Sequence, residues 1–121
     1  MKDVQLPFDP VPLIEAITED IYAAYPQLLT RYGEGGKDKC REDNMHHLKH
    51  LQTAFVLEND QFFIDYAVWL NGILTSRGML PALLIDNLER VDRAVRGHLS
   101  EELETAYRRM LASAVKRLSE E

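Results

Sequence analysis

Apolar residues recur every three or four positions along most of this chain, and the two-residue alternation of strands is almost absent. The plainest case is one seam at helical spacing, made of Leu84, Leu88, Val91 and Val95. The pattern predicts an all-α fold of about five antiparallel helices, with globin-like or four-helix-bundle-like packing. At 121 residues we expect one helical domain over 12–119, preceded by an N-terminal extension over 1–11.

Prolines, glycines and capping residues predict where these helices begin and end. Pro12 favours the first turn of a helix that breaks near Pro26, and a short continuation should end at Gly33 in a left-handed cap. The other helices are expected over 38–57, over 61–77 after Asp60 as N-cap, from Pro81 until Gly97, and from 101 after Ser100 as N-cap.

The formal net charge of −6 argues against a nucleic-acid-binding protein. Basic residues of the last predicted helix are interleaved with glutamates, as on an ordinary solvated face. The single cysteine excludes an internal disulfide. Neither a secretory signal nor a run long enough to cross a bilayer is visible, so we expect a cytoplasmic protein without membrane contact.

The segment 61–77 is unusual because it is apolar over most of its circumference. Most of its large side chains share one broad face, namely Phe62, Phe63, Tyr66, Leu70, Ile73 and Leu74. Ile64 and Val68 lie on the other side. In so small a chain few positions can be surrounded completely, which predicts a homodimer whose interface includes Ile64 and Val68.

The stretch KCREDNMHHLKHL, over 39–51, places three histidines within about three helical turns. His47 falls on the same face as the apolar residues and should point inward. His50 and Asp43 lie at one edge of that face, and His46 points away. A buried imidazole needs a hydrogen-bond partner, for which Asp43 or a tyrosine hydroxyl is available.

Three interpretations of these histidines stay open. The first is a structural core histidine, and the second is a pH-responsive or ligand-contacting histidine. The third is a metal site, since His46 and His50 have the spacing of a helical zinc pair. The paired ligand motif of bundle metal centres is absent, so we predict no metal. Cys40 reads as a small buried hydrophobe rather than a reactive thiol.

No catalytic motif is present. GEGGK resembles a phosphate-binding loop, but Arg31 stands where that pattern needs its first glycine, and Asp38 follows Lys37 in place of serine or threonine. Neither a nucleophile elbow nor a dinucleotide fingerprint occurs. We therefore predict no catalytic residue, no cofactor and no enzymatic activity.

RYGEGGKDKCREDNMHHLKHL followed by FFIDYAVWLNGILTSRG resembles a helical region that precedes the cobalamin-binding domain of bacterial regulatory proteins. The resemblance covers about 26–95. The cobalamin domain and its cobalt-ligating DxHxxG motif are both absent from this sequence. Trp69 is also not followed by the Glu-His pair with which some cobalamin photoreceptor bundles cover the cofactor. The resemblance implies a sensory helical module, without carrying cobalamin binding to this chain. It favours Asp43, His47, Tyr66 and Trp69 as one cluster.

The predicted function is a stand-alone regulatory or sensory module that acts through dimerisation and contact with a partner protein. Its candidate ligand-binding or switch residues are Asp43, His47, His50, Phe62, Phe63, Tyr66 and Trp69. A first alternative is a globin-like sensor holding a tetrapyrrole against these aromatic rings, with His47 or His98 as axial ligand. A second is a metal-dependent hydrolase that uses the region of His46 and His50.

Overall fold

The computed structural model describes residues 5–121, and every regular element in that part is a helix. The five helices are α1 (Val11–Ala24), α2 (Gln27–Val56), α3 (Asp60–Ser76), α4 (Pro81–Val95) and α5 (Glu101–Ser119). The predicted all-α class is confirmed. No helix among these residues is both long enough and apolar enough to cross a bilayer.

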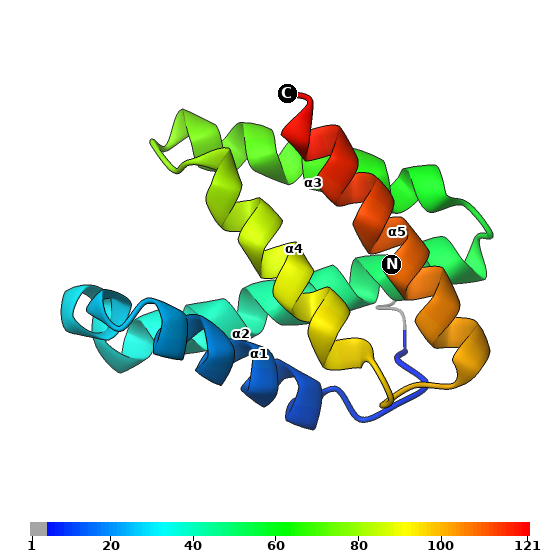
Figure 1. The fold of residues 1–121 in the computed structure, drawn as a ribbon, viewed down its shortest axis with the longest axis horizontal. Coiled ribbons are helices and arrows are strands. Elements are labelled where there is room, and N and C mark those ends of the chain that lie inside the picture. The colour runs from blue at the N-terminus through cyan, green and yellow to red at the C-terminus, as the bar shows by residue number, and fades with distance from the viewer. Residues whose placement is uncertain (1–4) are drawn as a thin grey trace.

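The five helices share one cluster of buried apolar side chains, with members from every helix. α1 packs against α2 and α4, α3 packs against α2 and α5, and α4 packs against α5. In Figure 1, α4 and α5 lie across α2, while α1 lies along α2 at the bottom and α3 crosses at the top. The extension before α1 also reaches the core, because the ring of Phe8 meets Tyr107 edge-on at 6.2 Å.

Several predicted helix starts are confirmed, and one is wrong. Pro12 and Pro81 occupy the first turns of α1 and α4, and the Ser100 hydroxyl accepts a hydrogen bond from the Leu103 amide at 3.3 Å. The N-cap of α3 is Asn59 rather than Asp60, since the Asn59 side chain accepts from the amide of Gln61. Asp60 is therefore the first residue inside the helix, where its charge still favours the helix dipole.

Gly33 has the positive φ of the predicted cap, 64°, but its ψ of −162° is not that of a left-handed helix end, and the chain does not leave the helix for long. Helical structure resumes directly after it, so α2 is a kinked helix of 30 residues instead of two helices with a loop over 34–37. A glycine is one of the usual causes of a kink within a continuing helix.

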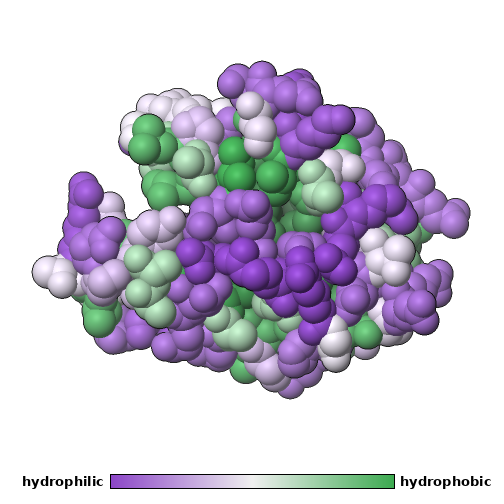
Figure 2. Space-filling view, viewed as in Figure 1, coloured by the Kyte–Doolittle hydropathy of each residue, from purple (hydrophilic) through white to green (hydrophobic). Residues whose placement is uncertain are grey.

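α3 buries one face only. Phe63, Ala67 and Asn71 are buried at successive turns, while Trp69 on the opposite side is 61% exposed. The apolar circumference of this helix thus divides into a core face and a solvent face. Exposed apolar side chains also gather at the turn between α3 and α4, at the upper left of Figure 2, where Met79, Leu80 and Leu83 are exposed.

Candidate functional site

His47 lies in the interior, as predicted. It is 2% exposed and follows the buried face of α2, beside Leu48 and one turn before Leu51, both of which are fully buried. The helix rotation that buries these leucines also turns the imidazole inward. A buried imidazole needs a hydrogen-bond partner for each of its two ring nitrogens, and both nitrogens of His47 have one.

The partners of His47 come from two other helices. Its Nδ1 lies 2.7 Å from the hydroxyl oxygen of Tyr66 on α3, and the ring also hydrogen-bonds the side chain of Asn87 on α4. The Asn87 amide nitrogen donates to Asn44 Oδ1 at 2.7 Å, which leaves the Asn87 carbonyl oxygen as the acceptor for the ring. We therefore assign the tautomer in which Nε2 donates to Asn87 and Nδ1 accepts from the Tyr66 hydroxyl.

The chain of hydrogen bonds continues along α2. The amide nitrogen of Asn44 donates to the Cys40 carbonyl oxygen at 2.9 Å and contacts the Cys40 sulfur at 3.6 Å. A continuous polar path thus runs from Cys40 through Asn44, Asn87 and His47 to Tyr66. It links α2, α4 and α3 inside a mostly apolar core, and each member has a partner.

Burial decides the protonation of this path. It lowers the pKa of His47 to about 4, although the hydrogen bond to Asn87 works in the opposite direction. Burial also raises the pKa of the Tyr66 hydroxyl, with a smaller contribution from the charge of Asp43. At neutral pH the imidazole and the phenol are therefore both uncharged.

Tyr66 also joins the buried path to a group of aromatic rings that reaches the surface. Its ring stacks on His50 with centroids 3.7 Å apart and planes 14° apart, and His50 in turn stacks on Phe62 at 6.0 Å. On its other sides Tyr66 lies 5.7 Å from Phe63 and 6.4 Å from Trp69. We call these five side chains the aromatic cluster.

The structure brings together six of the seven predicted site residues. His47 and Phe63 are buried, His50, Phe62 and Tyr66 are partly buried, and Trp69 is exposed. Asp43 is the exception. Of the two partners predicted for the His47 ring, Asp43 or a tyrosine hydroxyl, the structure has the tyrosine, Tyr66, while the Asp43 carboxylate pairs with Lys39 at 3.1 Å.

The predicted interface residues lie beside this cluster on α3. Val68 is partly buried and packs against the core, and Ile64 is partly buried as well. Because successive residues of an α-helix are about 100° apart, Gly72 lies one turn after Val68 and Trp69, between them on the solvent side of α3. A Cβ built on Gly72 would meet no atom within 4 Å. This part of α3 is therefore a flat surface bordered by two apolar side chains.

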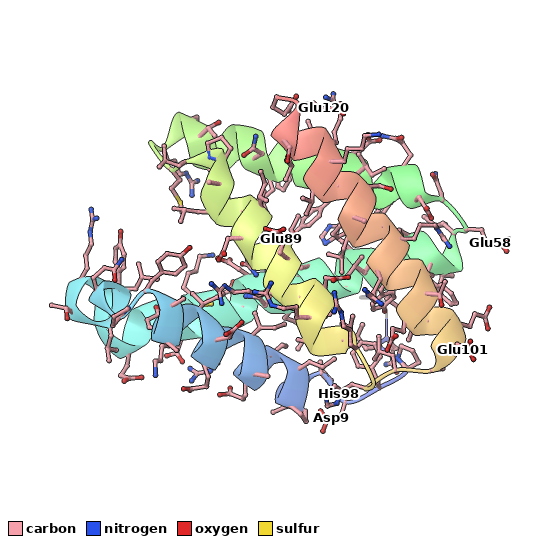
Figure 3. The ribbon with its side chains drawn as sticks, in the orientation of Figure 1. Asp9, Glu58, Glu89, His98, Glu101 and Glu120 are labelled. Atoms are coloured by element: carbon pink, nitrogen blue, oxygen red, sulfur yellow. The ribbon has the colours of Figure 1, made fainter. Side chains whose placement is uncertain are left out.

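The geometry gives little support to metal or haem ligation at the histidines. No group of three histidine, cysteine or acidic side chains in residues 5–121 converges in a way that could hold a metal ion. Nδ1 of His50 donates to the His46 carbonyl oxygen at 2.7 Å, and both ring nitrogens of His47 are engaged. His98 is exposed at the turn between α4 and α5 (Figure 3).

Sequence reasoning missed the amides that complete the interior. Asn87 lies one position before Leu88, at the edge of the apolar seam of α4, and an amide at such an edge is the signal that could have identified it. Gln52 is buried on α2 and accepts a hydrogen bond from the Tyr107 hydroxyl at 2.6 Å. Both amides link α2 to a helix distant in sequence, which no local pattern reveals.

No family model, curated protein or solved structure matches this chain. The resemblance to the helical region of cobalamin-dependent regulators stays a prediction.

Proposed function

We propose that this chain is a non-catalytic regulatory module that forms a homodimer through the solvent face of α3. The observation that carries the proposal is Trp69, a large aromatic side chain that is 61% exposed. Tryptophan is among the residues most enriched at the energetic centres of protein interfaces. A second copy of α3 is the occupant that we assign to this face.

The backbone geometry of α3 favours close approach of a second helix. Gly72 leaves open space beside Trp69 and Val68, so two helices crossing there could bring their backbones together. In a two-fold dimer the same patch serves both subunits, and Trp69 of each copy would cover Gly72 of the other. Val68 and, one turn before it, Ile64 extend this face toward the beginning of α3, and both belong to the predicted interface.

The aromatic cluster supports a regulatory role for such a dimer. Trp69 packs on Tyr66, and the Tyr66 hydroxyl binds the buried imidazole of His47. A shift of Trp69 on dimerisation would therefore act on the polar path that joins α2, α3 and α4. A signal of this kind needs two alternative packings whose equilibrium is biased by contact at the surface.

Sedimentation equilibrium tests the proposal with a matched pair of variants. Trp69→Ala should weaken the dimer at least about tenfold, as expected for a central interface aromatic. Tyr32→Ala removes another exposed aromatic ring, 55% exposed and located beside the kink of α2, and should leave the dimer unchanged. A monomeric wild type, or equal dimer affinities for both variants, would overturn the proposal.

The tetrapyrrole sensor finds less support from the same residues. Axial ligation by His47 would require loss of its hydrogen bond to Tyr66 or to Asn87, and the ring has no third nitrogen. Absorbance spectra after incubation with haem test this alternative directly, because ligation would produce a Soret band that His47→Phe abolishes.

A further inference from the structure

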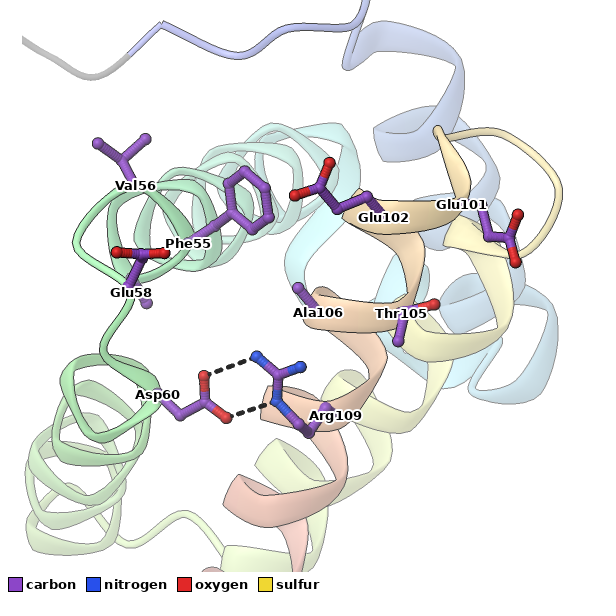
Figure 4. Close-up of a pocket in the computed structure, with 10 residues that line it drawn as sticks. Phe55, Val56, Glu58, Asp60, Glu101, Glu102, Thr105, Ala106 and Arg109 are labelled. Carbon is purple, nitrogen blue, oxygen red and sulfur yellow. Dashed lines mark hydrogen bonds and ion pairs between the residues drawn. The ribbon is translucent and has the colours of Figure 1, made fainter.

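A second surface, which does not include Trp69, has the features of a docking site. An open groove of about 950 Å³ lies between the end of α2 and the beginning of α5. Its floor includes Ala54 and Ala106, which are buried, together with the partly exposed ring of Phe55. Figure 4 shows Phe55 and Glu102 on opposite sides of the groove, with Asp60 and Arg109 closing one end.

The rim of this groove is acidic. Four carboxylates and one guanidinium line it, namely Glu58, Asp60, Glu101, Glu102 and Arg109. Arg109 is neutralised by Asp60 through two hydrogen bonds of 2.7 and 3.0 Å. The other three carboxylates form no ion pair within residues 5–121, so the groove carries an uncompensated negative charge around an apolar floor.

Glu58 is the least expected of these carboxylates. Glu101 and Glu102 lie in the first turn of α5, where the helix dipole stabilises them. Glu58 instead follows the end of α2, where the dipole disfavours a negative charge, and its φ of 51° lies in the left-handed region that favours glycine. This backbone closes α2, because the amides of Glu58 and Asn59 donate to the carbonyl oxygens of Phe55 and Ala54.

We propose that this groove binds a basic amphipathic peptide segment of a partner protein. Apolar side chains of the segment would cover Phe55 and the exposed Val56, while its lysines or arginines would pair with Glu58 and Glu102. The net charge of −6 would attract such a segment over longer distances. A small cation alone would leave the apolar floor uncovered.

The proposal can be tested by fluorescence anisotropy. The probe is a labelled peptide in which single leucines alternate with pairs of lysines. Glu58→Gly removes the charge while suiting the left-handed backbone, so the fold is retained and peptide affinity should fall several-fold. Glu58→Gly combined with Glu102→Lys should weaken binding at least about tenfold, the scale reported for charge complementarity at interfaces. Glu34→Lys, an exposed site on the kinked part of α2, should change affinity less than about twofold.

Two control ligands distinguish the peptide from other cations. A peptide with serines in place of the leucines should bind at least about tenfold more weakly, because it cannot cover the apolar floor. Spermine should compete only weakly. The proposal would be overturned if the leucine peptide did not bind, or if the serine peptide or spermine bound as tightly as the leucine peptide. It would also be overturned if Glu34→Lys lowered the peptide affinity as much as the groove variants do. Trp69→Ala should leave peptide binding intact, which separates this result from the dimer.

Discussion

The hydroxyl of Tyr66 lies 2.7 Å from Nδ1 of His47 and joins an exposed aromatic cluster to the buried polar path. This contact spans two helices and combines two roles. It satisfies a buried imidazole nitrogen, and it fixes the ring on which Trp69 and His50 pack.

Tyr66→Phe keeps the ring and its stacking but removes the donor to His47. A buried nitrogen then loses its partner, so the free energy of unfolding should fall by about 1–3 kcal/mol. Tyr25→Phe is the matched control, because no hydrogen bond of the Tyr25 hydroxyl is found within residues 5–121, and it should change stability by less than about 0.5 kcal/mol. Urea denaturation measures both, and equal effects would contradict the assigned contact.

The buried imidazole should make the fold acid-sensitive above the range in which carboxylates titrate. Because the pKa of His47 is about 4 in the folded state and near 6.5 when unfolded, the unfolded chain binds more protons between these values. The contribution of His47 to the free energy of unfolding is therefore fully present above pH 6.5 and is lost as the pH falls toward 4. The expected loss between pH 7.5 and pH 5 is about 2 kcal/mol.

His47→Gln isolates this contribution, since an amide can hydrogen-bond but does not titrate. The variant should lose much less stability than the wild type between pH 7.5 and 5, as measured by urea denaturation at each pH. The same slope in both proteins would show that the acid sensitivity arises elsewhere.

The kink of α2 provides a backbone test with two neighbouring glycines. Gly33→Ala places a Cβ at φ of 64° and ψ of −162°, a region that is essentially restricted to glycine, and should destabilise the fold by about 1–3 kcal/mol. Gly35→Ala introduces a better helix former where a Cβ meets no atom within 4 Å, and should stabilise the fold by up to about 1 kcal/mol. Thermal unfolding compares them, and destabilisation by both would argue against the left-handed kink at Gly33.

Gly72→Ala should have opposite effects on the isolated chain and on the dimer. The added Cβ meets nothing within 4 Å, so helix α3 gains up to about 1 kcal/mol in thermal unfolding of dilute protein. If two helices approach closely at this glycine, the same Cβ weakens the dimer. Sedimentation equilibrium measures that second effect, and unchanged dimer affinity would place the interface elsewhere.

Much of the fold could be predicted from local signals. In the sequence, helical spacing places six residues of the last helix on one face, and in α5 all of them are buried, namely Leu103, Tyr107, Met110, Leu111, Ala114 and Leu118. The inward aim of His47 followed from the same rule. The start of α3 was misplaced by one residue, because Asn59 and Asp60 are adjacent and both are good N-caps.

The site was less predictable, since its partners come from separate helices. Nothing within α2 indicates that Asn87 on α4 would reach His47, or that Lys39 would hold Asp43 at the helix surface. The acidic groove was missed for the same reason. It forms only where the turn after α2 meets the first turns of α5, two segments more than 40 positions apart in the sequence.

Trp69 offers the most direct test of the dimer, because it is the only tryptophan in the chain. Its emission and its quenching by acrylamide can be followed while the protein is diluted from high concentration. A dimer that buries Trp69 should show blue-shifted emission and protection from acrylamide at high concentration, and both should be lost on dilution as the ring becomes exposed. Emission from a solvated tryptophan with the same quenching at every concentration would contradict it.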